Sequence, residues 1–274
     1  MQASSVVDPR KIVLYVEDTF DKANPTPGEL EAMKAAAADL GASGFDTVIL
    51  AFLHPKMDGT LYYNNIPFSG TLSFLPSMVA AIKARGIVSR VLLSIGPFAE
   101  DYAAINSNVP RFKQTFADLV TRVGLDGVDF DLEEDYDTFS DLLVDLTGWV
   151  SNAGRSVTAA PFQREDYWIK VLQRTSPGGR SWFAWWNLQI YGGADYGTWV
   201  SYLSGLADNP QGFLVPGYNV YAGTTPTSLE STLRDLKSSY PSLAGSFVWQ
   251  YELIKQYGYT ASQFAAAIKA GLGS

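Results

Sequence analysis

The sequence alternates eight times between a short apolar run and a longer amphipathic stretch, and this alternation limits the possible folds more than any other feature. The apolar runs are Ile12–Val16, Thr47–Leu53, Val91–Ile95, Gly127–Leu132, Ser156–Ala160, Asn187–Tyr191, Phe213–Tyr218 and Gly245–Gln250. The stretches with a helical pattern are Gly28–Leu40, Leu75–Arg85, Val109–Val123, Thr138–Ala153, Tyr167–Gln173, Thr198–Leu206, Ser228–Tyr240 and Ala261–Ala270. Continuous apolar runs are typical of parallel strands that are buried on both faces.

Eight strand–helix pairs in 274 residues predict the α/β class and a single (β/α)8 TIM barrel. We expect one domain over residues 1–274, with the barrel at about residues 11–272, because no linker or low-complexity segment divides the chain. A doubly wound open sheet is the alternative, but the G-x-G-x-x-G motif typical of that fold is missing. In a barrel of this kind, the active site lies at the carboxyl ends of the strands.

The composition excludes several classes of function. The chain has 20 Lys and Arg against 28 Asp and Glu, a formal net charge of −8, which disfavours nucleic acids and anionic membranes as partners. The absence of cysteine excludes disulfides, thiolate metal sites and thiol nucleophiles. His54 is the only histidine, so a zinc site with several histidines is impossible, and we interpret His54 as structural.

The first residues and the length of the apolar runs bear on the location of the protein in or outside the cell. No apolar run approaches the roughly 20 residues that cross a bilayer. The first residues, MQASSVVDPR, lack the basic and then apolar pattern of a secretion signal. We expect a secreted monomer whose export signal is not in this chain, with a cytoplasmic protein as the alternative.

Three acidic residues at a spacing of two mark the fourth run. Because side chains alternate along a strand, Asp129, Asp131 and Glu133 share one face, and Val128 and Phe130 lie on the other. Unpaired carboxylates inside a barrel are costly, so such a row indicates function. The alternative is a solvated acidic edge strand, which the position of this run in the middle of the series disfavours.

Two kinds of chemistry fit inward-facing carboxylates. Asp129 and Asp131 could bind a metal ion in an oxygen-rich site. Alternatively, a carboxylic acid could protonate the leaving oxygen of a glycoside. Close carboxylates raise one another's pKa, which suits a general acid, and Glu133 is the outermost of the three with the longest side chain. Asp131 is then placed to share a proton with Asp129 or to hold a group of the substrate.

The segment Asp126–Glu133 resembles the D-x-x-D-x-D-x-E motif of glycoside hydrolase family 18, which contains chitinases and endo-β-N-acetylglucosaminidases. Further similar elements occur along the chain from about Lys11 to Tyr251. They are Ser94-Ile95-Gly96-Pro97 for the family's S-x-G-G, Ala160-Pro161-Phe162, Gln189-Ile190-Tyr191 for its Q-x-Y element, and Trp249 at the end of the eighth strand.

The resemblance implies a retaining hydrolase that cleaves β-1,4 linkages in chitin or chito-oligosaccharides, with the substrate's own 2-acetamido oxygen as nucleophile. It implies that Glu133 is the acid and then the base, and that Asp131 orients the acetamido group and shares a proton with Asp129. Tyr191 would donate to the acetamido oxygen. No metal or cofactor is implied.

Trp249 and Gln189 are the expected substrate-binding residues, with Trp249 under the sugar. Gln189 and Ser94 face the barrel interior, where they would contact either the acids or the ligand. The expected partner is an N-acetylglucosamine-containing oligo- or polysaccharide. Two alternatives stay open: an endo-β-N-acetylglucosaminidase that acts on N-glycan cores, and a non-catalytic, chitinase-like sugar-binding protein.

Some positions depart from the family pattern or carry no clear signal. Pro97 replaces the second Gly of S-x-G-G, and Gly192 stands where many chitinases have Asp or Asn. Neither departure touches the acid motif, so both bear on the subsites rather than on the chemistry. Residues 62–65 (Tyr-Tyr-Asn-Asn) have the composition of a loop that could line a cleft. Glu17, Asp18 and Glu252 also follow strands at the expected active end, but no pattern assigns them a role.

Overall fold

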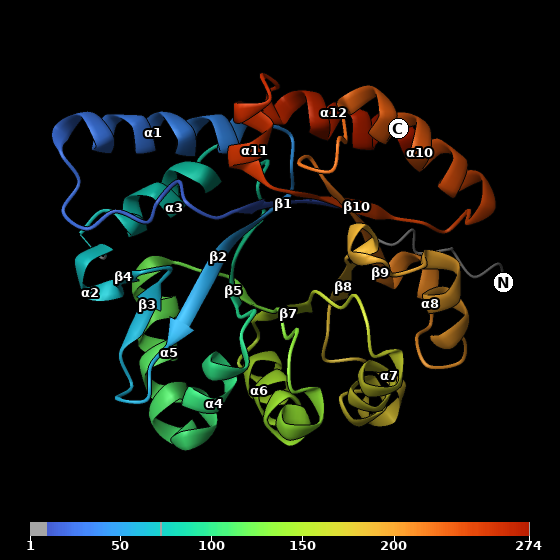
Figure 1. The fold of residues 1–274 in the computed structure, drawn as a ribbon, viewed down its shortest axis with the longest axis horizontal. Helices are drawn as coiled ribbons and strands as arrows, with labels where there is room; N and C mark the ends of the chain where they lie inside the picture. Colours follow the sequence, from blue (N-terminus) through green and yellow to red (C-terminus); the bar gives the residue numbers. More distant parts are fainter. Residues whose placement is uncertain (1–9, 72, 274) are drawn as a thin grey trace, which may run out of the picture.

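A closed parallel barrel forms the centre of the computed structural model, which describes residues 10–71 and 73–273 (Figure 1). Its eight strands are β1 (Lys11–Val16), β2 (Thr47–Pro55), β5 (Arg90–Ile95), β6 (Gly127–Phe130), β7 (Ser156–Ala159), β8 (Trp185–Leu188), β9 (Leu214–Asn219) and β10 (Gly245–Trp249). They are ordered β1-β10-β9-β8-β7-β6-β5-β2, and the pairing of β1 with β2 closes the ring. The predicted (β/α)8 barrel is therefore confirmed, and the open sheet is excluded.

Helices surround the barrel on all sides (Figure 1). The longer ones are α1 (Pro27–Ala42), α3 (Leu75–Lys83), α4 (Ala99–Ser107), α5 (Val109–Val123), α6 (Ser140–Asn152), α7 (Glu165–Arg174), α8 (Tyr196–Tyr202), α10 (Pro226–Ser239), α11 (Tyr251–Gln256) and α12 (Ala261–Gly271). Short turns of helix are α2 (Phe68–Thr71), α9 (Pro210–Phe213), η1 (Tyr136–Phe139), η2 (Pro177–Gly179) and η3 (Ile190–Gly192). The sequence pattern missed α4 and α11, which are only nine and six residues long. No helix in the described part of the chain is both long and apolar enough to cross a membrane.

Local sequence signals set the ends of several helices. Thr26 and Glu29 form a capping box at the start of α1, and Thr260 and Gln263 form another at the start of α12. Such a box satisfies two backbone groups that the first turn leaves free. Gly124 ends α5 in the left-handed conformation, which favours glycine.

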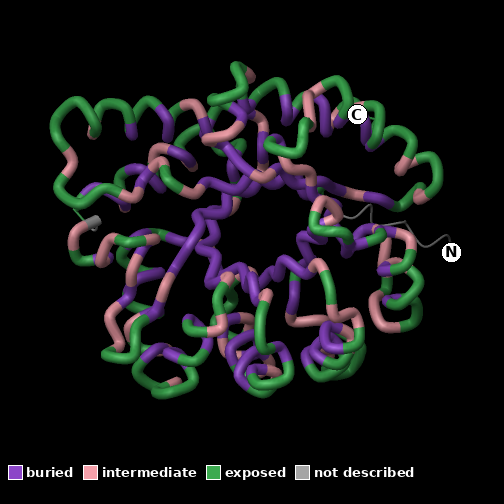
Figure 2. Tube along the Cα trace, in the orientation of Figure 1, coloured by how far each residue is buried: buried purple, intermediate pink, exposed green. Residues whose placement is uncertain are grey.

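The apolar core has an inner and an outer part. Trp185, Phe247 and seven further residues fill the barrel interior, whereas Trp186 belongs to the larger core between the strands and the helices. Adjacent Trp185 and Trp186 thus point in opposite directions, as expected for neighbours on a strand. Figure 2 shows the burial: the strands are buried, and the outward faces of the helices are exposed.

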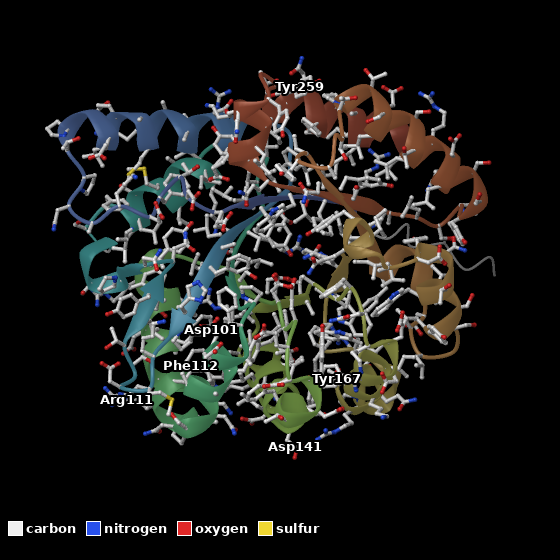
Figure 3. All side chains as sticks on the ribbon, in the orientation of Figure 1. Asp101, Arg111, Phe112, Asp141, Tyr167 and Tyr259 are labelled. Atoms are coloured by element: carbon white, nitrogen blue, oxygen red, sulfur yellow. The ribbon has the colours of Figure 1, made fainter. Side chains whose placement is uncertain are left out.

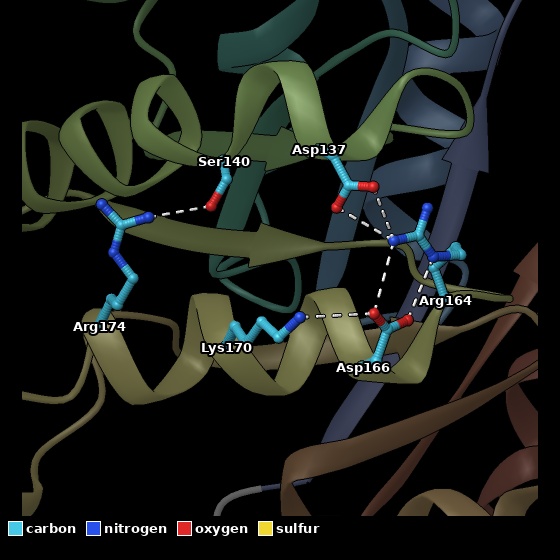
Figure 4. Close-up of polar contacts among 6 residues, drawn as sticks. All are labelled: Asp137, Ser140, Arg164, Asp166, Lys170 and Arg174. Carbon is cyan, nitrogen blue, oxygen red and sulfur yellow. Dashed lines mark hydrogen bonds and ion pairs between the residues drawn. The ribbon is translucent and has the colours of Figure 1, made fainter.

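Ion pairs join the exposed surfaces of two neighbouring helical segments (Figure 4). Arg164 lies 3.1 Å from both Asp137 and Asp166, and Arg174 donates to Ser140 over 2.9 Å. These pairs connect the start and end of α7 to η1 and α6. Because the groups are exposed, these contacts contribute little to stability.

Three segments differ from the sequence-based expectations. The fourth strand ends at Phe130 rather than at Leu132. The sixth strand covers residues 185–188 rather than 187–191. Tyr191 therefore lies in the η3 turn, which ends at Gly193 in a left-handed conformation. The expected loop at residues 62–65 is instead a hairpin of β3 (Leu61–Tyr63) and β4 (Ile66–Pro67), which extends the sheet beside β2. Its two central asparagines form the turn, and Asn64 has a positive φ of 50°.

Candidate active site

Asp129 lies inside the barrel on β6 with none of its surface exposed. Its carboxylate accepts hydrogen bonds from Tyr15 Oη (3.0 Å), Ser94 Oγ (2.8 Å), Thr158 Oγ1 (2.6 Å) and Asn187 Nδ2 (3.3 Å). Burial raises the pKa of Asp129, and these donors oppose that rise by stabilising the ionised form. The solvated edge strand is therefore wrong, because β6 lies between β5 and β7 and its acid faces inward.

The chain beyond β6 carries the next two acids in the same alternation. The Asp131 amide donates to the Ile95 carbonyl (2.9 Å), and the Glu133 amide donates to the Pro97 carbonyl (3.3 Å). The backbone thus continues beside β5 after the regular strand has ended. Gly96 is required there, because a Cβ on it would lie 1.9 Å from the Asp131 carbonyl oxygen.

Asp131 and Glu133 are linked through Gln189. The charge of Glu133 raises the pKa of Asp131, so the two carboxyl groups lie near one another. Nε2 of Gln189 lies 3.1 Å from Asp131 Oδ1 and 2.9 Å from Glu133 Oε1, and 2.8 Å from the Ala160 carbonyl. Gln189 therefore holds the two acids side by side at the end of the barrel.

The environment of Asp131 favours its protonated form. Burial raises the pKa of Asp131 well above its usual value, and the nearby charges of Glu133 and Asp129 raise it further. A carboxyl pair in this arrangement keeps one proton over a wider pH range than an isolated carboxylate does.

These two acids open into a cavity of about 250 Å³ at the carboxyl ends of the strands. The residues that line it are Tyr15, Phe52, Pro97, Asp131, Glu133, Ala160, Gln189, Tyr191, Phe247 and Trp249. The Tyr191 ring stands edge-on to Phe247 with 6.0 Å between centroids, and burial raises the Tyr191 pKa well above its usual value, so the hydroxyl stays a donor. The Trp249 ring lies 5.7 Å from that of Phe52.

The cavity gathers most of the residues that the sequence selected. It is lined by Glu133, Asp131, Gln189, Tyr191 and Trp249, which lie at or just beyond the ends of three different strands, β6, β8 and β10. Asp129 does not line the cavity and lies deeper in the barrel.

Sequence reasoning missed other residues of the site, namely Tyr15 and Phe52 in the wall and Asn187 and Thr158 around the buried acid. The alternation of β1 was the available signal for Tyr15, since Val13 and Tyr15 both face the barrel interior. Tyr15 links the wall to the buried acid, because its hydroxyl also accepts a hydrogen bond from Asn187 (3.0 Å).

Both departures from the family pattern have a structural counterpart. Pro97 lines the cavity. A Cβ at Gly192 would lie 3.2 Å from the ring of Phe162, so that aromatic side chain occupies the space beside residue 192. A larger residue at 192 would require Phe162 to move.

His54 does not line the cavity. Its Nδ1 lies 2.9 Å from Asp101, a buried residue of α4 that is labelled beside β2 in Figure 3. The imidazole also stacks on Phe98 with 5.9 Å between ring centroids. These contacts connect β2 to α4, in agreement with a structural role.

The donors around Asp129 do not fit the metal-binding alternative. Both of its oxygens already accept hydrogen bonds from neutral donors. Over residues 10–71 and 73–273, no group of three or more His, Cys, Asp or Glu side chains is placed to hold a metal ion.

A second cavity, of about 400 Å³, lies at the opposite end of the barrel. Lys11, Arg90 and Trp185 line it, and each is the first residue of its strand. The carboxylate pair is therefore at the end where barrels of this type carry their chemistry, and the larger cavity is not.

Comparison with known proteins identifies similar folds. No protein-family model matches the sequence, and no curated protein matches it significantly. Among solved structures, a GH18 chitinase from Pseudoalteromonas aurantia superposes with a TM-score of 0.68 at 17% identity, over 96% of this chain and 100% of that one.

Two further structures give the same result. The catalytic domain of a family GH18 chitinase from the fern Peteris ryukyuensis has a TM-score of 0.67 at 19% identity, covering 97% of this chain and 100% of the other. A Group IV chitinase from Ostrinia furnacalis has a TM-score of 0.69 at 12% identity, with the same coverage. The chain thus has the fold of GH18 chitinases over nearly its whole length.

Proposed function

We propose that this protein is a glycoside hydrolase of the family 18 type that cleaves β-1,4 linkages between N-acetylglucosamine units with retention of configuration. The observation that carries the proposal is the pair of acids Asp131 and Glu133, which Gln189 holds together in an aromatic-walled cavity. The D-x-x-D-x-D-x-E motif and the likeness in fold to GH18 chitinases support it.

The placement of the acids favours substrate assistance. Double displacement by two protein carboxylates needs one group on each side of the scissile bond, with the pair about 5–5.5 Å apart. Asp131 and Glu133 come from one segment and accept from the same Gln189 nitrogen, so they approach the sugar from the same side. The nucleophile then comes from the substrate itself, as the 2-acetamido oxygen.

In the first step, Glu133 gives its proton to the glycosidic oxygen as the bond from that oxygen to C1 breaks. The acetamido oxygen forms a bond to C1, which produces a cyclic oxazolinium ion. Asp131, left ionised, accepts the N–H of this ion and balances its positive charge. Tyr191 donates a hydrogen bond to the former acetamido oxygen.

In the second step, the Glu133 carboxylate takes a proton from a water molecule. The resulting hydroxide attacks C1, the bond between C1 and the acetamido oxygen breaks, and the acetamido group is restored. Two inversions at C1 leave a product of the original β configuration. Glu133 is then protonated again.

Positioning of the sugar comes from the cavity walls. The indole of Trp249 offers an apolar face against which a sugar ring stacks. Gln189 holds both acids, so its amide sets their orientation relative to that ring. Asp129 acts from below, where its negative charge helps to keep the proton on the pair above it.

Product analysis tests this function. The protein is incubated with N-acetylglucosamine oligomers, with glucose oligomers of the same β-1,4 linkage and with a high-mannose glycopeptide, and the products are followed by mass spectrometry and by the anomeric signals in NMR. We expect β-anomeric products from the first substrate and no cleavage of the second. Cleavage of the glycopeptide alone would instead identify an endo-β-N-acetylglucosaminidase, and binding without cleavage would identify a sugar-binding protein.

A further inference from the structure

The hairpin of β3 and β4 lies beside β2, the strand that carries Phe52 of the cavity wall (Figure 1). β3 pairs with the end of β2, where Leu53 lies opposite Tyr63. Asn64 forms the turn of the hairpin and does not line the cavity itself. An effect of this turn on a bound sugar must therefore pass through the neighbouring chain segments.

The backbone of Phe52 lies where the regular pairing of β2 is interrupted. The register between β2 and β5 shifts between Leu50 and Leu53, and the pairing of β1 with β2 ends at Leu50. Phe52 itself is buried, with 7% of its surface exposed. Because buried N–H and C=O groups are costly without hydrogen bonds, the backbone of Phe52 needs partners from outside the regular ladder.

Asn64 supplies these partners. Its Oδ1 accepts a hydrogen bond from the Phe52 amide over 2.8 Å, and its own amide donates to the Phe52 carbonyl over 2.9 Å. Its Nδ2 donates to the Glu17 carbonyl over 2.9 Å, and the buried Tyr63 hydroxyl donates to the same carbonyl over 3.0 Å. Glu17 directly follows β1, so Asn64 joins the ends of β1 and β2.

The backbone conformation of Asn64 explains why an asparagine serves here. Its φ of 50° lies in the left-handed region, which asparagine tolerates better than most residues other than glycine. Glycine would adopt the same turn but would provide neither of the two side-chain hydrogen bonds. The side chain, rather than the turn alone, therefore distinguishes asparagine at this position.

Phe52 is one of three aromatic residues that pack together in the cavity wall. Its ring lies 5.7 Å from that of Trp249, and the Trp249 ring lies 5.5 Å from that of Tyr15. All three residues line the cavity. Because protein interiors are closely packed, a shift of the Phe52 backbone would displace its ring against Trp249, on which the sugar stacks in the proposed function.

We infer that Asn64 is a positioning residue of this site: by holding the backbone of Phe52, it sets the aromatic wall against which the sugar binds. The inference rests on the proposed function and defines it further, because it assigns part of the affinity for the sugar to a residue outside the cavity. Asp131 and Glu133 are held by Gln189 instead. A change at residue 64 therefore acts on binding of the sugar rather than on the proton transfer.

Asn64→Gly tests the inference, because it removes both side-chain hydrogen bonds and keeps a backbone that glycine adopts without strain. In the Glu133→Gln background, we expect the affinity for the N-acetylglucosamine tetramer, measured by calorimetry, to fall about three- to tenfold. In the protein with Glu133 intact, KM should rise with kcat unchanged. Asn65→Gly, at the exposed next position of the turn, is the matched control and should bind like the protein with both asparagines.

A double-variant cycle separates positioning from a general loss of stability. Phe52→Leu alone should weaken binding, and adding Asn64→Gly should weaken it no further, because both substitutions act through the same ring. Fully additive losses, or a fall in kcat with KM unchanged, would overturn the inference. If the tetramer binds equally well with and without the Asn64 side chain, only the inference fails. If no tetramer binds when Asn64 is intact, the proposed function fails, and the inference fails with it.

Discussion

The carboxylates of Asp131 and Glu133 accept hydrogen bonds from the same nitrogen, Nε2 of Gln189, over 3.1 and 2.9 Å. Burial and the nearby charge of Glu133 raise the pKa of Asp131, which favours a proton on this pair of acids. When the proton lies on Glu133 the pair holds a general acid beside a carboxylate anion. These are the two groups that the proposed first step needs: a proton donor for the glycosidic oxygen and a negative charge beside the oxazolinium ion.

Glu133→Gln tests the general acid. The amide has nearly the same shape and can still hydrogen-bond, but it cannot donate the proton. We expect kcat on N-acetylglucosamine oligomers to fall by about 10²–10⁴-fold, with binding retained in calorimetry. Glu134→Gln is the matched control, because this neighbouring carboxylate is exposed and accepts a hydrogen bond from the Ala99 amide (3.1 Å). A Glu133→Gln protein with more than a tenth of normal activity would remove Glu133 from the acid role.

Asp131→Asn separates catalysis from stability. Its pKa is raised in the folded protein, so ionised Asp131 costs stability at neutral pH, and that cost disappears below the ordinary carboxyl pKa of about 4. We expect Asp131→Asn to raise Tm at pH 7, with the gain vanishing as the pH falls toward 4, while turnover drops because the oxazolinium ion loses its counter-charge.

The same variant should change the pH profile. Removing the negative charge of Asp131 leaves the proton of the pair less tightly held, so the alkaline limb of kcat/KM should move to lower pH. Thermal melts at several pH values and a pH–rate profile provide both measurements. An unchanged rate, profile and Tm together would mean that Asp131 does not interact with the acid as the structure places it.

Gly217→Ala tests the packing under the cavity. A Cβ on Gly217 would lie 2.0 Å from the Phe247 ring, so this ring, which forms part of the cavity wall, must shift. We expect the free energy of unfolding to fall by about 1–3 kcal/mol, measured by chemical denaturation, and KM to rise. Gly28→Ala is the control, since no atom lies within 4 Å of the added group. Equal stability of the two variants would show that the barrel interior is less tightly packed than described.

The sequence predicted the barrel and the inward-facing acids because both depend on local patterns. Eight apolar runs and the alternation of Asp129, Asp131 and Glu133 are visible within single strands. The interior residues around Asp129 could not be found in this way, since Tyr15 and Asn187 are 172 residues apart and meet only when the barrel closes. Which donors surround a buried acid depends on strand order and register.

The errors in the strand ends have a similar origin. The apolar pattern of the sixth run continues through Ile190 and Tyr191, but the glycines that follow form a turn and end the strand at Leu188. The hairpin at residues 61–67 was mistaken for a loop because its strands are three and two residues long. Strands this short form only against an existing neighbour, here β2, which the local sequence does not reveal.

Tyr191→Phe tests substrate assistance itself. If the acetamido oxygen is the nucleophile, the Tyr191 hydroxyl stabilises it as the ring closes, and its removal costs about 1–3 kcal/mol of transition-state stabilisation. A thiazoline mimic of the oxazolinium ion should bind the wild type more tightly than substrate does, and the variant should lose affinity for this mimic in parallel with kcat/KM. Tyr202→Phe, on an exposed tyrosine of α8, serves as the control and should match the wild type.

Tests with glucose oligomers and with the thiazoline mimic distinguish substrate assistance from double displacement by two protein carboxylates. A protein carboxylate acting as nucleophile would not need the acetamido group, so glucose oligomers would be cut and a covalent glycosyl adduct could be trapped and located by mass spectrometry. Under substrate assistance neither result occurs, because the reactive bond forms within the sugar. Parallel losses in mimic affinity and in kcat/KM would place Tyr191 at the acetamido oxygen. A Tyr191→Phe protein that loses turnover but binds the mimic normally would place the hydroxyl elsewhere.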